Sequence, residues 1–426
     1  MAAVESPVAQ AHRQSDWRRW ILRFLAVAGP GLVVAFADTE AGSITTAATS
    51  GAQYGYKLIL LQLLLIVPLF VVQEMTVRLG VVTGKGHARL IREHYGIGWT
   101  WVSLGTVLVT NIAALITEFA GIAGAALIFG LNPAPIVIIA AVMLIGVIFT
   151  ASYKRAEVFA LGLCLVEVLF IPAAIAAHPP AREVVMQGLF GSQPLGDHNY
   201  LLLIASNIGA VIMPWMIFYQ QSATVDKGLR VPDLNFARID TALGAVFTQA
   251  IMCAVIIMTA ATLFIHHIPV SDAAHAALAL EPLVGHLAGV TFGVALIGAS
   301  MLGAFVVSLA TAWAFGEAFG WRCSLNDGLR AKRFTGLFIA CVVVAAGVVL
   351  IPNLPLIQIT VNVEAFNGFV LPIVLGFLLV LVNDKRVIGE RHNRPLGNVI
   401  TFTLSGVCIV LGVWMAIMTM LHPGGG

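Results

Sequence analysis

Long, uniformly apolar stretches recur along this chain, and they constrain its fold more than any other feature. They lie near residues 24–43, 56–77, 98–129, 134–150, 156–177, 201–222, 240–265, 288–318, 336–352, 356–382 and 398–421. Each is long enough to cross a hydrocarbon core of about 30 Å as an α-helix. Strands of a membrane β-barrel would alternate apolar and polar side chains, and these stretches do not alternate. The sequence therefore predicts an all-α polytopic membrane protein with eleven transmembrane helices.

The composition agrees with a membrane protein. Only 10% of the 426 residues are charged and 59% are hydrophobic, whereas a soluble domain is about 25% charged. This argues against a soluble enzyme, a disordered protein and a nucleic-acid binder. The formal net charge of +2 gives no reason to expect an anionic partner. The five cysteines are scattered, so neither a zinc site nor a disulfide framework is expected.

The basic residues are segregated between alternate loops. Of the 23 Lys and Arg residues, all but Lys57 and Arg182 fall in the N-terminal segment or after an even-numbered apolar stretch. Cytoplasmic loops carry an excess of Lys and Arg. We therefore expect a multi-pass protein of the cell inner (plasma) membrane, with its N-terminus in the cytoplasm and its C-terminus outside.

Two apolar stretches are interrupted at matching positions. The first reads ADTEAGS over residues 37–43, and the sixth reads SNIGAVIMPW over residues 206–215. Gly42, Gly209 and Pro214 are the expected helix-breaking residues, because glycine permits unusual backbone angles and proline lacks an N–H. Backbone carbonyls freed by a break must be buried or line a wet cavity. Interrupted helices in corresponding positions of two halves indicate an inverted-repeat transporter.

The predicted architecture is therefore a LeuT-like 5+5 inverted repeat with helices 1 and 6 broken at mid-membrane. A cytoplasmic N-terminal tail is expected at 1–23. The transporter core is expected at 24–390, with the first repeat at 24–177 and the second at 201–382. The extra helix 11 and a short external C-terminus make up 391–426.

The first interruption carries two carboxylates, Asp38 and Glu40. Carboxylates are costly in hydrocarbon, so intramembrane acids face cavities and mark ion or substrate paths. Residues two apart on a regular helix point in different directions, and both can approach one ion only where the helix unwinds. The alternative is that these polar residues cap a helix end or tie helices together. We favour a cation site.

At these positions the sequence resembles the Nramp (natural resistance-associated macrophage protein) family of divalent-metal transporters. The match is ungapped over 29–56, and the octapeptide RLGVVTGK at 78–85 follows at the family's spacing. Residues 210–214 match the family's Ala-x-x-Met-Pro pattern. Glu317 and the Leu-Pro pair at 371–372 match the family's spans 8 and 10.

Departures from the family pattern bear on the transported and coupled ions. The family's Asp-Pro-Gly-Asn motif is EAGS here, at residues 40–43. Trp215 and Gln220 stand where the family has two histidines linked with proton movement, and Glu364 stands where it has a glutamine near the metal. The resemblance therefore indicates a divergent branch and leaves its coupling ion open.

The resemblance implies a set of metal ligands at the two breaks. These are the Glu40 carboxylate, the Ser43 hydroxyl, the Ala210 carbonyl and the Met213 thioether, with Asp38 and Glu364 as additional ligands. A thioether favours transition metals, whereas added carboxylates favour harder ions such as Mg²⁺. Mn²⁺ satisfies both tendencies, so the expected substrate is Mn²⁺ first and Fe²⁺ second. The metal is cargo, and no cofactor is expected.

Without the two family histidines, protons would have to use carboxylates. The candidates are Glu40, Asp38, Glu118, Glu364 and Glu167. Glu118 and Glu167, which are not among the metal ligands, are assigned to a proton pathway, although Glu167 is equally well explained as a hydrogen-bonded core acid. A proton and a metal ion compete for one carboxylate, and this competition is a sufficient basis for symport or antiport. The expected partners are the divalent ion, H⁺ and the lipid bilayer, with no nucleic acid and no obligate protein partner.

Two other functions remain open on the same fold. One is a Mg²⁺ transporter, and the other is a carrier of an organic amine. An enzyme is not expected, because no span holds a nucleophile–base set or a pair of metal-ligating histidines. The loop after span 7 is rich in imidazoles and acids, and it is either a metal-collecting loop or a short solvated helix. Its residues of this kind are His266, His267, Asp272, His275, Glu281 and His286.

Overall fold

The structure of the chain is a computed structural model. It describes the backbone of residues 7–270, 275–276, 283, 285–351, 354 and 356–421. Side chains are described over the same ranges except 7–16, 356–362, 364–365 and 411–421. These described residues form helices joined by loops and contain no β-strand.

All of the predicted apolar stretches coincide with helices. Stretches that form one helix each are α4 (Ile59–Thr83), α5 (His87–Ile128), α6 (Pro133–Ile148), α12 (Leu234–Thr259) with its π-helical end η2 (Ala260–Phe264), α14 (His286–Phe319), α15 (Lys332–Val349), α16 (Leu356–Asn383) and α18 (Pro395–Leu421). Stretches divided into two helices are α2 (Pro30–Ala37) with α3 (Ala41–Tyr54), α7 (Tyr153–Glu167) with α8 (Phe170–Ala176), and α10 (His198–Val211) with α11 (Pro214–Asp226).

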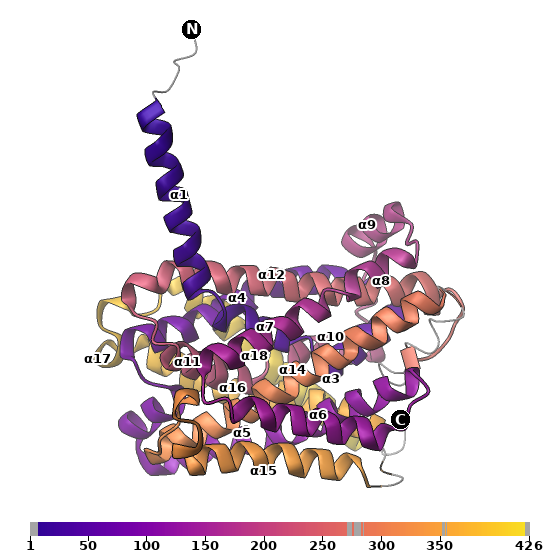
Figure 1. Cartoon of the computed structure of the whole chain (residues 1–426). Helices are drawn as coiled ribbons and strands as arrows, with labels where there is room; N and C mark the ends of the chain where they lie inside the picture. Colours follow the sequence, from indigo (N-terminus) through magenta and orange to yellow (C-terminus); the bar gives the residue numbers. More distant parts are fainter. Residues whose placement is uncertain are drawn as a thin grey trace.

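The remaining helices lie outside the apolar stretches or at their ends. They are α1 (Pro7–Val27), α9 (Ala181–Phe190), α17 (Lys385–Ile388) and the short turns η1 (Val231–Asp233), η3 (Leu325–Arg330) and η4 (Gly389–Arg391). Helix α1 projects from the bundle, and α9 lies at the far end of the molecule from α17 (Figure 1).

Length and composition alone qualify eight helical segments of the described chain to cross a membrane, or nine if the bent pair Trp17–Val27 and Pro30–Ala37 is one span. Three of the predicted spans are outside the eight. The first is divided into the short helices α2 and α3, and α6 and the described part of α18 are apolar but shorter.

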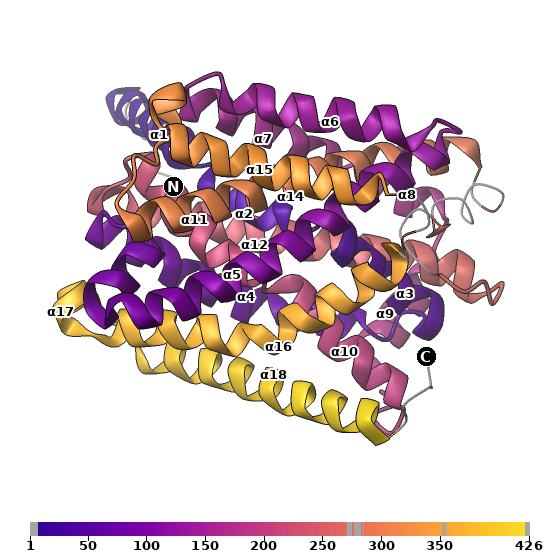
Figure 2. The ribbon, with the colours of Figure 1, turned by 90° about the horizontal axis from the view of Figure 1, so that it is seen from below.

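The broken helices lie inside the bundle. Helix α12 packs against α2, α3 and α4, and α14 packs along α5 and α11. Seen from below, α16 and α18 run side by side along one edge, while α6 and α15 run along the opposite edge (Figure 2). The residues at the two breaks, 38–40 and 211–213, are buried within this bundle.

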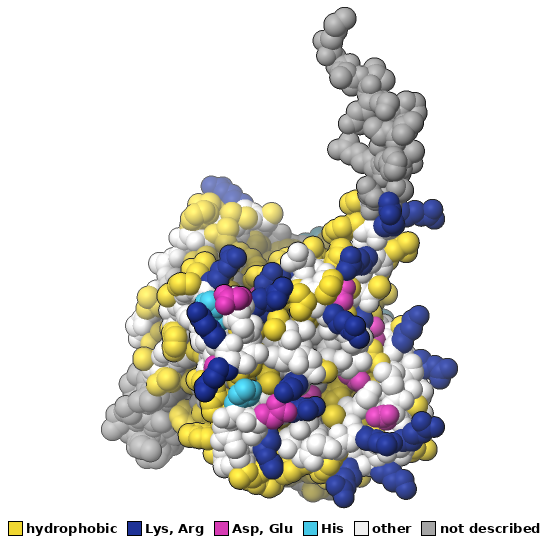
Figure 3. Space-filling view, turned by 90° about the vertical axis from the view of Figure 1, so that its left-hand side faces the viewer, with side chains coloured by type: hydrophobic (Ala, Val, Ile, Leu, Met, Phe, Trp, Pro, Cys, Tyr) yellow, Lys and Arg dark blue, Asp and Glu magenta, His cyan; other side chains and the backbone are white. Residues whose placement is uncertain are grey.

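The N-terminal segment and the loops that follow even-numbered spans, here called the even-numbered loops, gather at one end of the molecule, as their shared positive charge predicts. The backbone N–H of Tyr153 donates to Asn326 Oδ1 at 3.0 Å, which joins the loops after spans 4 and 8. Arg23 pairs with Asp233 at 3.4 Å, which joins the N-terminal segment to the loop after span 6. Figure 3 shows this end, where dark-blue Lys and Arg side chains are spread over the face.

Candidate metal site between two broken helices

The break in span 1 lies between α2 and α3. Helix α2 ends at Ala37, and Asp38 still has α-helical backbone angles. Glu40 then adopts an extended conformation and is the N-cap residue of α3, with its carbonyl accepting from Ile44 N–H at 2.9 Å. Asp38 and Glu40 are buried. The unwinding that would let both acids approach one ion therefore occurs.

The break in span 6 follows from a single proline. In a continuous helix the carbonyl of Ala210 would accept from the N–H of residue 214, but Pro214 has none. Helix α10 accordingly ends at Val211, Ile212 and Met213 are extended, and α11 begins at Pro214. The Ala210 carbonyl is thus released from the helix.

The two breaks meet through one hydrogen bond. Ser43 Oγ donates to the released Ala210 carbonyl at 2.9 Å. Both residues are buried, as are Glu40 and Met213 beside them in the chain. Two ligands that the resemblance implies, from opposite halves of the molecule, are therefore in direct contact.

The thioether of Met213 has a partner that the sequence did not suggest. Trp215 Nε1 donates to Met213 Sδ at 3.1 Å, and both side chains are buried. Trp215 stands at a position where the family has a histidine. Its indole N–H can only donate. The hydrogen bond therefore uses a lone pair of the sulfur that a soft metal ion would otherwise coordinate.

Asp38 and two further acids, Glu118 and Glu167, accept hydrogen bonds at or beside the span 1 break. Gln73 Nε2 donates to Asp38 Oδ2 at 3.4 Å. The backbone N–H of Ala41, in the first turn of α3, donates to Glu118 Oε2 at 3.5 Å. Glu167 accepts a short hydrogen bond from the hydroxyl of Thr39, within the span 1 break.

Two predicted helix-breaking residues are not at the breaks. Gly42 lies in the first turn of α3 and Gly209 lies within α10. The residues between the paired helices are instead 38–40 and 212–213. Glycine is tolerated inside a helix, and Gly209 has a packing role, because its Cα lies 3.6 Å from the point where a Cβ of Gly368 would be. Of the three residues, only Pro214 lies at a helix end that borders a break.

The structure does not describe the side chains of some predicted site residues. The backbone of Glu364 lies in α16, but its side chain is outside the described residues, as are Asp272 and Glu281 of the loop after span 7. Among the described residues, no three His, Cys, Asp or Glu side chains converge to hold a metal. A metal at the breaks would therefore also need hydroxyl, carbonyl or thioether ligands.

Sequence reasoning missed Gln73 and Thr39. Gln73 interrupts the apolar stretch of α4. A polar residue inside a span could have indicated a contact with the acids at the span 1 break. Thr39 lies between the two noticed acids. Its hydroxyl oxygen also lies 2.6 Å from the Phe36 carbonyl oxygen, at the end of α2, so its one proton is shared between that carbonyl and Glu167.

A family model described as natural resistance-associated macrophage protein-like matches residues 31–418. The chain belongs to the Nramp family. Divalent metal cation transporter MntH of Ralstonia nicotianae is 27% identical over 420 residues, which cover 94% of this chain and 91% of the relative. The protein of the same name from Staphylococcus aureus strain bovine RF122 / ET3-1 is 25% identical over 430 residues, which cover 96% and 93%.

Solved structures support the fold of this Nramp chain. A manganese transporter of Eremococcus coleocola superposes with a TM-score of 0.72 at 19% identity, covering 100% of this chain and 91% of that one. MhsT in complex with L-phenylalanine superposes with a TM-score of 0.64 at 15% identity, covering 91% and 97%. The predicted LeuT-like fold class is confirmed.

Proposed function

We propose that this chain is a secondary active transporter of divalent metal cations, Mn²⁺ first and Fe²⁺ second, that works by alternating access. The observation that carries the proposal is the Ser43–Ala210 hydrogen bond, which joins the two breaks beside Glu40 and Met213. Relatives named divalent metal cation transporter and a structural neighbour named manganese transporter support it. Mn²⁺ suits a site that mixes carboxylate, hydroxyl, carbonyl and thioether groups.

In the proposed site, Glu40 supplies the charge and Met213 the soft ligand. Ser43 and Ala210 supply neutral oxygens, and the metal takes the place of the hydroxyl proton that now lies between them. Asp38 and Glu364 are the proposed additional ligands. Because these groups belong to both breaks, opening either half-helix would dismantle the site, and this is what alternating access requires.

Proton coupling is proposed to use Glu118 and Glu167. Glu118 accepts from the first turn of α3, and Glu167 accepts from Thr39 in the span 1 break. Protonation of either acid would therefore act on the backbone that also positions Glu40. This link would let a proton and a metal ion influence each other without sharing one carboxylate.

The chain is a multi-pass membrane protein, and we propose the inner (plasma) membrane with the N-terminus in the cytoplasm. The even-numbered loops with their Lys and Arg side chains would then face the cytoplasm. The proposed boundaries are those expected above, with the two repeats at 24–177 and 201–382.

The test is metal uptake into liposomes that contain the purified protein and a metal-quenched dye. Glu40→Gln keeps the shape of the side chain and removes its charge, so we expect Mn²⁺ uptake to fall by more than about 100-fold, beyond the loss typical of an outer-shell partner. The control is Glu183→Gln on exposed α9, which should transport normally. Unchanged uptake by Glu40→Gln would refute the site.

One observation favours Mg²⁺ as the alternative substrate. The hydrogen bond from Trp215 engages the Met213 sulfur and leaves the site richer in hard oxygen ligands. A competition experiment separates the two ions. If excess Mg²⁺ abolishes Mn²⁺ uptake and Met213→Ala leaves uptake unchanged, Mg²⁺ is the substrate.

A further inference from the structure

A separate cavity of about 500 Å³ lies at the basic end of the molecule. It is bounded by α4, the start of α12, and the segment that runs from η4 into the first turns of α18. Its volume is in the range of small-molecule sites. None of the residues assigned to the metal or proton pathway lines it, so the proposed transport function does not account for it.

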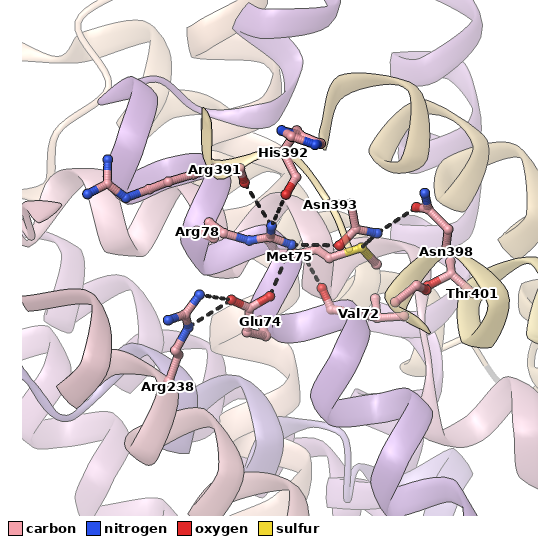
Figure 4. A network of polar contacts seen from close by, with 12 residues as sticks. Val72, Glu74, Met75, Arg78, Arg238, Arg391, His392, Asn393, Asn398 and Thr401 are labelled. Carbon is pink, nitrogen blue, oxygen red and sulfur yellow. Dashed lines mark hydrogen bonds and ion pairs between the residues drawn. The ribbon is translucent and has the colours of Figure 1, made fainter. Parts of the chain in front are cut away.

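The inner wall of the cavity is a buried polar network centred on Arg78 (Figure 4). The Arg78 side chain is 7% exposed and pairs with Glu74 Oε2 at 3.1 Å. Its Nη1 donates to the carbonyls of Arg391 and His392 at 2.8 and 3.2 Å, and its Nη2 donates to Asn393 Oδ1 at 2.8 Å. These bonds hold the segment before α18 against α4, so the wall is preformed.

The cavity carries an excess of positive charge. Glu74 is already shared, because its Oε1 also accepts from Arg238 Nε and Nη2 at 2.8 Å each. Arg391 and Arg394 add two exposed guanidinium groups at the rim, with Glu390 as the other acid. Four arginines against two glutamates leave a net charge of +2, which favours an anion.

Two buried nitrogen atoms on this wall lack a hydrogen-bond partner among the described residues. They are Arg78 Nε and His392 Nδ1. The Nε atom of arginine is always a donor, and a buried donor without an acceptor is costly. Neither atom is accessible from the cavity, so an anion there would be bound by the exposed guanidinium groups at the rim.

The opposite side of the cavity is apolar and continues onto the outer surface of the bundle. Phe70 on α4 and Leu396 and Ile400 on α18 line the cavity. Leu396 is 70% exposed, and Phe402, further along α18, is 62% exposed. A ligand that filled the cavity would thus have a charged part at the arginines and an apolar part along α18.

We propose that this cavity binds the headgroup of an anionic phospholipid. Its phosphate would lie between Arg238, Arg391 and Arg394, and an acyl chain would cover the exposed face of α18. Basic pockets between transmembrane helices at the cytoplasmic side bind such headgroups, and the orientation proposed above places this end there. A free phosphate would satisfy the arginines but would leave the apolar side uncovered.

Native mass spectrometry of the full chain in detergent tests the proposal, with phosphatidylglycerol and phosphatidylcholine of identical acyl chains as probes. Wild-type protein should retain phosphatidylglycerol in preference. The double variant Arg391→Gln/Arg394→Gln should bind it about 25-fold more weakly, since each basic side chain near an anionic lipid contributes about a fivefold factor. Equal retention of the two lipids by the wild type would overturn the proposal.

The matched control is Arg322→Gln/Arg330→Gln, which removes the same charge from exposed positions at the same end but outside the cavity. It should bind phosphatidylglycerol as the wild type does, and equal weakening by both double variants would overturn the proposal. Arg391→Lys/Arg394→Lys keeps the charge and should restore most of the affinity, which separates lost charge from a folding defect.

Inorganic phosphate distinguishes a lipid from a free anion. If phosphate alone at millimolar concentration raises the thermal midpoint of the wild type as much as phosphatidylglycerol does, and displaces that lipid, then the site binds phosphate and the lipid assignment is wrong. We expect a midpoint rise with phosphatidylglycerol and none with phosphate. The rise should be absent in Arg391→Gln/Arg394→Gln.

Discussion

At the scale of single residues, the hydrogen bond from Trp215 to Met213 links a family departure to metal choice. Trp215→Phe removes the donor and keeps an aromatic ring, which frees the Met213 sulfur. We expect the preference for Mn²⁺ over Mg²⁺ to rise by about two- to thirteenfold, since one hydrogen bond is worth about 0.5–1.5 kcal/mol. Mg²⁺ competition against Mn²⁺ uptake in liposomes measures this preference.

The control for this change is Trp99→Phe, because Trp99 is an exposed tryptophan on α5. It should leave the Mn²⁺ to Mg²⁺ preference as in the wild type. If Trp215→Phe shows the same Mn²⁺ over Mg²⁺ preference as Trp99→Phe, the Met213 sulfur does not contact the transported ion.

A buried ion pair offers a second prediction at the residue scale. Lys227 Nζ lies 2.7 Å from Glu157 Oε1, and the two side chains are only 10% and 13% exposed. Lys227→Met leaves the Glu157 carboxylate without its cation, which should lower the free energy of unfolding by about 3–5 kcal/mol. Unfolding of the purified protein in detergent measures the loss.

The double variant Lys227→Met/Glu157→Gln removes both charges and should recover most of that stability, because the main cost is an uncompensated buried charge. If the double variant is no more stable than Lys227→Met, the uncompensated Glu157 charge is not the cause of the loss. The lost hydrogen bond from Lys227 Nζ to the Ala28 carbonyl, 2.7 Å long, would then be its cause.

The sequence predicts the candidate site at this scale only as far as local patterns reach. The acids, the hydroxyl and the methionine at the breaks are visible from the motifs and the family resemblance. The donors that contact them from elsewhere are not, because Gln73 on α4 meets Asp38 only after the helices pack. Trp215 is local to Met213, but the hydrogen bond depends on the extended backbone at the break.

At the scale of elements, the short helix α2 is held at its N-terminus by α12. Asp240 Oδ1 accepts from Gly29 N–H at 3.1 Å and Oδ2 accepts from Gly31 N–H at 2.7 Å. A carboxylate at a helix N-terminus accepts hydrogen bonds from the free N–H groups there. Its negative charge also interacts favourably with the positive end of the helix dipole. Glycine permits the close approach, because a Cβ at residue 31 would lie 2.7 Å from Thr241 N.

Gly31→Ala should therefore destabilise the protein, whereas alanine at a glycine with open space around it should not. The added methyl group must displace α2 from α12, and overpacking of this kind costs about 1–3 kcal/mol. Gly146→Ala on α6 is the control, since nothing lies within 4 Å of its added Cβ and alanine favours a helix by up to about 1 kcal/mol. Thermal midpoints in detergent should move in opposite directions.

Apolar stretches predict the helices well but do not place their breaks. Every apolar stretch becomes helical, and a proline that removes one N–H marks the span 6 break directly. Glycine predicts a helix break less reliably than proline does, because a glycine either permits an unusual backbone angle or allows a close contact between helices. Gly209 serves a contact with Gly368, and the break falls three residues later at Ile212.

At the scale of the whole molecule, the charge pattern constrains topology before any contact is known. The alternation of basic and nearly charge-free loops predicts which loops share an end, and the contacts Tyr153–Asn326 and Arg23–Asp233 agree. The opposite end holds α9, where Gly188 packs against Ile59. Loop charge cannot predict how α5, α12 and α14 surround the broken helices, since that depends on side-chain packing.

The proposed orientation makes a prediction about the termini. Alkaline phosphatase folds into its active form outside the cytoplasm, and green fluorescent protein becomes fluorescent inside it. With the positive end in the cytoplasm and an odd number of spans, a phosphatase fused to the C-terminus should be active and a fluorescent protein there should be dark. A fluorescent protein fused to the N-terminus, or after Arg330 at the basic end, should be bright. Fluorescence at both termini would mean an even number of spans, and since α6 and α18 are the shorter apolar helices, those two would be the first to re-examine.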